Sequence, residues 1–89
     1  MSNKKPIIED LLFTLKQQRD ELRVQANLAG KEVKDELQGL EHKYDKLTSE
    51  YDNVKHAVTD SAGEVFSSLE LVAEELKNSF TRITKQLRK

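Results

Sequence analysis

The only side chains of a type that exchanges protons near neutral pH are two histidines, His42 and His56. Asp52, His56 and Asp60 follow one another at intervals of four residues, which places them on one face of a helix. A divalent metal accepts such ligands, but an exposed row on one helix needs a second element to close a site. Di-iron helical bundles bind metal through a Glu-x-x-His pattern, but no glutamate lies three residues before either histidine. We therefore expect no metal site and no cofactor.

The acidic pairs and the tyrosines do not indicate catalysis either. Adjacent acids such as Asp35–Glu36 and Glu74–Glu75 diverge on a helix, so they cannot act together as a general acid and base. The chain has no cysteine and no glycine-rich phosphate loop. We predict no catalytic residues and no enzymatic activity. Tyr44 and Tyr51 fit core positions with their hydroxyls at the rim, and a partner-binding groove is the alternative.

Basic residues gather at the C-terminal end of the chain, opposite apolar Phe80, Ile83 and Leu87. This pattern is typical of a cationic amphipathic helix that could lie on anionic lipid. The same order, with acids first and bases last, also complements a helix dipole. Nucleic acid is not an expected partner, because no aromatic or glycine-rich reader accompanies the charge. The candidate contacts to an anionic surface are Lys77, Arg82, Lys85, Arg88 and Lys89.

The elements that must position these residues are helices, because apolar residues recur at alternating intervals of three and four between Leu37 and Val58. This spacing predicts a seam packed against a second helix that follows a turn. The predicted seam residues within the chain are Leu37, Leu40, Tyr44, Leu47, Tyr51, Val54, Leu69, Leu76 and Phe80.

The predicted architecture is an all-α, long antiparallel helical hairpin, a coiled coil that assembles into a homo-oligomeric bundle. Residues 1–5 are frayed, residues 6–58 form one long helix beginning at Pro6, residues 59–63 form a turn, and residues 64–88 form the second helix. Ser61 and Glu64 have capping-box spacing, and Asp60 is an alternative cap. A break at Gly30 would instead give a three-helix bundle.

A continuous first helix would be about 80 Å long and would extend well beyond the second helix. Its first thirty residues would then expose a large apolar surface, which monomers seldom leave open to water. We therefore predict a homodimer, most simply antiparallel, in which each overhang packs on its partner. The predicted oligomer interface is Ile8, Leu11, Leu15 and Leu22.

Composition agrees with a single helical domain spanning residues 1–89. Hydrophobic residues make up 36% of the chain and charged residues 35%, so the core must consist of seams between helices. The net charge of -1 favours neither nucleic acid nor membranes. No apolar run is long enough to span a bilayer, and the N-terminal segment lacks the pattern of a signal peptide. We expect a cytoplasmic protein.

The stretch from Val54 to Phe80, VKHAVTDSAGEVFSSLELVAEELKNSF, resembles short uncharacterised bacterial coiled-coil proteins. Those proteins have a long charged helix, a small turn, here Thr59–Asp60, and a second helix with an E-E-L-K-x-[AS]-F pattern, here residues 74–80. Tryptophans commonly stand in that group where this chain has Ala62 and Ala73. The resemblance implies a helical hairpin and no particular ligand or activity.

The function that follows is a non-enzymatic, self-associating scaffold, adaptor or small regulator acting through helix–helix contacts. Its expected partners are a second copy of itself and another helical protein. The alternative is a peripheral protein that binds lipid surfaces through the basic amphipathic helix 76–89.

Overall fold

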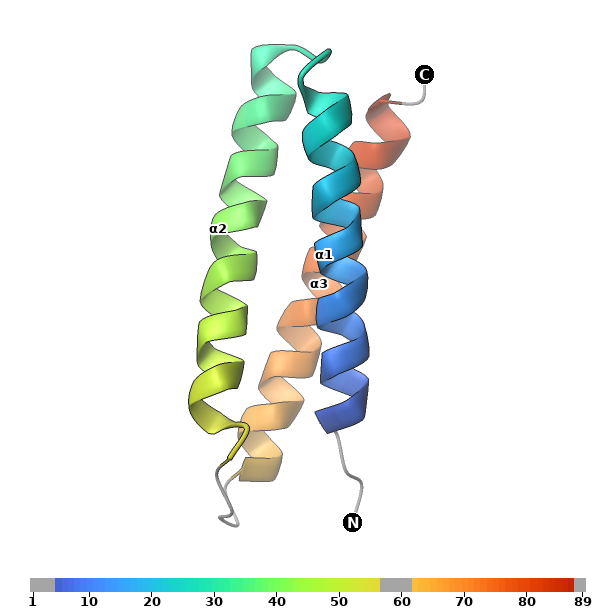
Figure 1. The fold of residues 1–89 in the computed structure, drawn as a ribbon. Helices are drawn as coiled ribbons and strands as arrows, with labels where there is room; N and C mark the ends of the chain where they lie inside the picture. The colour runs from blue at the N-terminus through green and yellow to red at the C-terminus, as the bar shows by residue number, and fades with distance from the viewer. Residues whose placement is uncertain (1–4, 57–61, 88–89) are drawn as a thin grey trace.

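The computed structural model describes residues 5–56 and 62–87, and the regular secondary structure in these ranges is all helical. Its three helices are α1 (Lys5–Ala26), α2 (Lys31–Val54) and α3 (Ala62–Leu87). Figure 1 shows that α1 and α3 run in the same direction and α2 runs opposite to both. The bundle is elongated, measuring 46 × 19 × 15 Å. The predicted all-α class is confirmed.

The prediction of one continuous helix over residues 6–58 is wrong, because the chain reverses direction after Ala26. The backbone N–H groups of Leu28 and Ala29 donate to the carbonyls of Gln25 and Ala26 at 3.1 and 3.0 Å, which closes the end of α1. Gly30 is the N-cap of α2 with extended backbone (φ -71°, ψ 168°). The reversal stabilises the fold because it lets α1 bury its apolar stripe inside the same chain.

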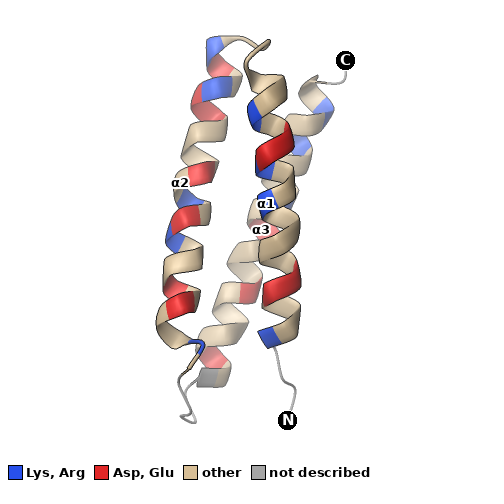
Figure 2. Cartoon of the chain, viewed as in Figure 1, with Lys and Arg blue, Asp and Glu red and all other residues tan. Residues whose placement is uncertain are grey.

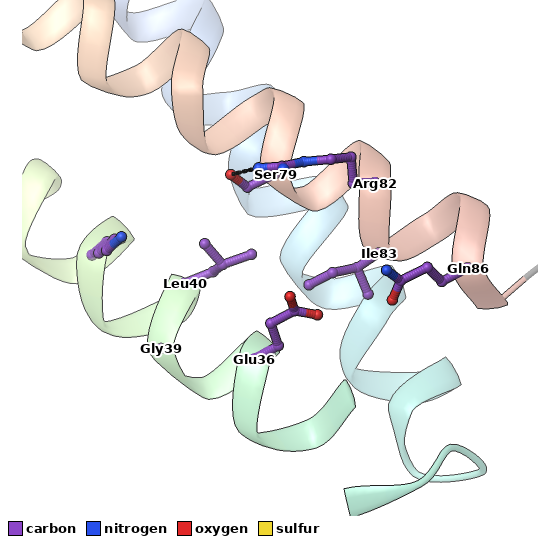
Figure 3. A pocket seen from close by; sticks show the side chains of 8 residues that line it. Glu36, Gly39, Leu40, Ser79, Arg82, Ile83 and Gln86 are labelled. Carbon is purple, nitrogen blue, oxygen red and sulfur yellow. Dashed lines mark hydrogen bonds between the residues drawn. The ribbon is translucent and has the colours of Figure 1, made fainter. Parts of the chain in front are cut away.

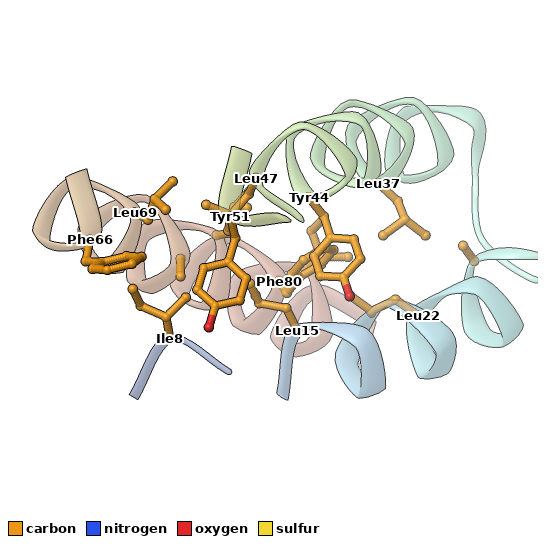
Figure 4. Packing of buried hydrophobic residues seen from close by; sticks show 14 residues of the cluster. Ile8, Leu15, Leu22, Leu37, Tyr44, Leu47, Tyr51, Phe66, Leu69 and Phe80 are labelled. Carbon is orange, nitrogen blue, oxygen red and sulfur yellow. The ribbon is translucent and has the colours of Figure 1, made fainter. Parts of the chain in front are cut away.

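The core runs the length of the bundle and draws on all three helices (Figure 4). Phe80 of α3 lies near its centre and is fully buried. Along α3 the buried residues recur strictly at intervals of three and four, which is the spacing of one helix face. The buried side chains are Ile8, Leu15, Leu22, Ala26, Leu37, Tyr44, Leu47, Tyr51, Phe66, Leu69, Ala73, Leu76, Phe80 and Ile83.

The predicted oligomer interface is corrected by this packing. Ile8, Leu15 and Leu22 are at most 1% exposed and belong to the chain's own core, and Leu11 packs against it. They are buried because α1 folds back on α3, the pair of helices with the most extensive contact. These four residues are therefore not a surface for a second copy.

The other predicted boundaries fall as follows. The second helix begins at Ala62 rather than residue 64 and ends at Leu87. Glu64 lies in its first turn. Ser61 and Asp60, the two predicted caps, and residues 59–61 of the predicted turn lie outside the described residues.

Candidate interaction surface

A hollow between α2 and α3 opens to solvent beside the C-terminal half of α3 (Figure 3). Leu40 and Ile83 point toward each other across it and form an apolar floor. The rims are polar, and Arg82 donates a hydrogen bond of 3.1 Å to Ser79 on one of them. The hollow has a volume of about 350 Å³ and is lined by Glu36, Gly39, Leu40, Lys43, Ser79, Arg82, Ile83 and Gln86.

This hollow continues in both directions along α2. Toward the start of α2 it shares Glu36 and Gln86 with a hollow of about 540 Å³ that reaches Glu32. Toward the end of α2 it shares Lys43 with a hollow of about 200 Å³ that reaches Glu50. The three together form what we call the α2–α3 groove, which at 1.5 Å per residue is about 27 Å long. That length suits an extended contact with another helix.

Gly39 leaves an opening in the rim of the α2–α3 groove. No atom lies within 4 Å of the position that a Cβ at Gly39 would occupy, and the backbone there has no positive φ. A glycine inside a helix costs about 1 kcal/mol relative to alanine. Nothing within the described part of the chain requires that residue to be glycine.

The α3 rim of the same groove carries an exposed apolar side chain, Val72, which is 42% exposed. It lies beside Leu47, whose side chain is buried beneath it in the core. Other exposed apolar residues lie along the helices and in the α1–α2 connection. They include Ile7, Phe13, Val24, Leu28, Val65 and Leu71.

The side of α2 away from the groove contacts α1 through polar and aromatic groups. The Tyr51 hydroxyl donates to a Glu9 carboxylate oxygen at 2.7 Å, and the Arg19 guanidinium lies 5.1 Å from the centre of the Tyr44 ring. Arg23 donates to Glu41 at 2.7 Å. The contact between α1 and α2 is the sparsest of the three helix pairs, so these polar links hold its register.

Sequence reasoning placed Tyr44 and Tyr51 in the core with hydroxyls at the rim, and the structure has them so (Figure 4). It did not find their partners. Glu9 is 42 residues from Tyr51, and no local pattern connects them. The carboxylate that accepts the hydrogen bond from a core tyrosine can be identified only when it is known which helices pack together.

The Tyr51–Glu9 hydrogen bond should make stability fall at high pH. Burial, the hydrogen bond to Glu9 and the Glu9 charge together raise the pKa of Tyr51 from 10.0 to about 12. The folded state therefore favours the protonated phenol, and this contribution is complete below about pH 10 and is lost as the pH rises toward 12.

We expect Tyr51→Phe to cost about 0.5–1.5 kcal/mol at neutral pH, because it removes one hydrogen bond. Urea melts at neutral pH and at increasing pH above 10 measure the difference. The difference in free energy of unfolding between wild type and Tyr51→Phe should become smaller as the pH rises. A constant deficit across this range would show that the hydroxyl does not titrate as the buried contact requires.

The basic residues predicted to contact an anionic surface do not form an amphipathic helix with an open apolar face. Lys77, Arg82 and Lys85 are exposed, whereas Arg88 and Lys89 lie outside the described residues. Phe80 and Ile83 are buried in the bundle, so they cannot enter a lipid interface unless α3 leaves the core. Figure 2 shows basic and acidic residues mixed along the bundle.

His42 and His56 both lie on the surface of the described bundle. Asp60, the third member of the candidate row with Asp52 and His56, lies outside the described residues. Across residues 5–56 and 62–87 no group of three or more His, Asp or Glu side chains is arranged to hold a metal ion.

Within the described ranges, none of the helices combines the length and apolar character needed to cross a membrane. Comparison of the chain with protein-family models, curated proteins and solved structures gave no match.

Proposed function

We propose that this chain is a non-enzymatic helical binding protein of the cytoplasm. It acts as a scaffold, adaptor or small regulator, and it associates with itself through helix–helix contacts. The α2–α3 groove is the observation that carries this proposal. A second helix laid along it would cover Leu40, Ile83 and Val72, which line it on the apolar side.

The charges on the groove rims support the same role. Glu36, Lys43 and Glu50 form no ion pair with other described residues of the chain, although each lies beside the groove. Unpaired charges around an apolar strip are typical of the polar rim of an interface, where they set orientation and partner choice. The groove therefore offers apolar contact and charge selection on one surface.

In this proposal self-association uses the α2–α3 groove, because the apolar stripe of α1 is buried within the chain. We expect the wild-type chain to sediment as a dimer or a monomer–dimer equilibrium at micromolar concentration. Val72→Lys should weaken association by at least about tenfold, because it places a charge on the apolar strip of the groove. Analytical ultracentrifugation of both proteins measures the effect.

Val24→Lys is the matched control, since Val24 is 70% exposed on α1 and lies outside the groove. It should associate as the wild type does. A wild-type chain that remains monomeric at every concentration would refute self-association. Equal loss in the two variants would show that the groove is not the contact surface.

A further inference from the structure

The charges on the outer surface of α2 are arranged symmetrically about Gly39. Glu36 and His42 lie three residues to either side of it, Asp35 and Lys43 lie four residues away, and Glu32 and Lys46 lie seven residues away. Offsets of three, four and seven place residues on one face of a helix. We call this the Gly39 face, and its members are Glu32, Asp35, Glu36, Gly39, His42, Lys43 and Lys46.

Every residue of the Gly39 face is exposed. Its side chains take part in no hydrogen bond or ion pair with the rest of the described chain, unlike Arg23 with Glu41 on the opposite side of α2. Among these seven residues the acids lie before Gly39 and the basic and imidazole groups lie after it, and Glu50, eleven residues after Gly39, follows them as an acid at the end of α2. Such a face is complementary to itself when reversed end to end.

From this pattern we infer that two copies of the chain pair through α2 in antiparallel orientation, with the two-fold axis passing at Gly39. The inference rests on the self-association proposed above and specifies its geometry. Each acid of one copy then meets the group at the equal and opposite offset in the other. The pairs are Glu32 with Lys46, Asp35 with Lys43, and Glu36 with His42, and the symmetry forms each pair twice.

The glycine at the axis gives this arrangement its close contact. The nearest approach of two crossing helices falls at the axis, and the open space around the Gly39 Cβ position lets the second backbone approach there. The hollow floored by Leu40 and Ile83 opens beside Gly39, so the second copy also covers apolar surface. The helix-propensity cost of a mid-helix glycine is then offset by contact between copies.

A parallel pair in the same register is disfavoured by the same charges. It would place Glu32 against Glu32 and Lys43 against Lys43, and like charges in contact repel. Antiparallel pairing is therefore selected by the sequence of α2 itself, since only reversal matches every offset with an opposite or hydrogen-bonding group.

Charge reversal tests this geometry directly. Lys43→Glu with Lys46→Glu makes the face acidic on both sides of Gly39, and Glu32→Lys with Asp35→Lys makes it basic on both sides apart from Glu36. Each double variant should dimerise at least about tenfold more weakly than wild type. Mixed together, the two should form a heterodimer, and the chain carrying all four substitutions should dimerise again.

The matched control is Lys77→Glu with Lys85→Glu, which changes the net charge as much as the lysine pair of α2 but lies on the exposed surface of α3. It should leave dimerisation within about twofold of wild type, as expected of charges outside the contact. Circular dichroism confirms that each variant is folded before its mass is measured by sedimentation.

A single cysteine locates the axis, because the chain has none of its own. Gly39→Cys should form a disulfide between copies rapidly on mild oxidation, since side chains at a two-fold axis meet their own equivalents within the short reach of the bond. Gln17→Cys, exposed on α1, should cross-link no faster than random encounter.

The results separate this inference from the broader proposal. A wild-type monomer overturns both. A wild-type dimer whose association survives the charge reversals, or whose reversed chains fail to form the heterodimer, overturns the Gly39 geometry while self-association stands. The Gly39 geometry is established if three results are obtained together. Each double variant dimerises more weakly, the mixed variants form a heterodimer, and Gly39→Cys cross-links rapidly.

Discussion

Replacing Phe80 with alanine is expected to lower the free energy of unfolding by about 3–5 kcal/mol, the usual cost of removing a phenyl ring from a packed core. Phe80 is fully buried among core residues of all three helices. Its removal therefore leaves a cavity that the close-packed neighbouring side chains cannot fill without rearrangement. A domain of this size has a total stability of roughly 5–13 kcal/mol. The variant should therefore lose a large part of its free energy of unfolding, and it should unfold at a much lower urea concentration than the wild type.

Phe13→Ala is the control for this substitution. Phe13 is 62% exposed on α1, and its loss should change stability by no more than about 0.5 kcal/mol. Urea denaturation followed by circular dichroism compares the two variants. Similar losses in both would mean that the packing of α3 on the other helices is not as the structure has it.

Leu15→Ala should destabilise the protein by about 2–5 kcal/mol, and the loss should be the same at every protein concentration. Leu15 is fully buried within one chain, so its contacts form in the monomer. In a dimer whose overhanging first helix packs on a partner, the loss would instead depend on concentration through mass action. Thermal melts of wild type and variant at widely separated concentrations distinguish the two.

The control is Leu71→Ala, because Leu71 is 62% exposed on α3. Its melting temperature should stay close to that of wild type. If the difference in melting temperature between wild type and Leu15→Ala vanished on dilution, the result would instead support a continuous first helix that packs on a partner chain.

The sequence is sufficient to predict which helix faces are apolar but not where the first helix ends. The spacing of three and four along residues 37–58 and along α3 selects the buried faces of α2 and α3, because a helix has only one face at that period. The only signal near the end of α1 is Gly30, which the sequence offered as the alternative break that gives three helices. Gly30 caps α2 without a side-chain hydrogen bond, and the reversal is stabilised by distant contacts such as those of Ile8 and Leu22.

For the candidate surface too, part follows from the sequence and part depends on how the helices pack. The residues of the Gly39 face can be read from the sequence, yet their symmetry has a meaning only once α1 is known to pack on the opposite side of α2. The α2–α3 groove depends on how side chains such as Leu40 and Ile83 meet across two helices. Such contacts are set by helix pairing, which a single helix pattern does not contain.

The most extensive helix contact in the bundle joins its first and last helices, and Gln18 and Thr81, linked across it by a hydrogen bond of 3.2 Å, are 63 residues apart. During synthesis α1 and α2 therefore leave the ribosome before their main partner exists. Their mutual contact is the sparsest of the three helix pairs, so Ile8, Leu15 and Leu22 lack most of their packing partners until α3 is synthesised. Folding completes only after α3 has emerged, so this interval is the period in which the nascent chain is most prone to aggregation and most in need of chaperones.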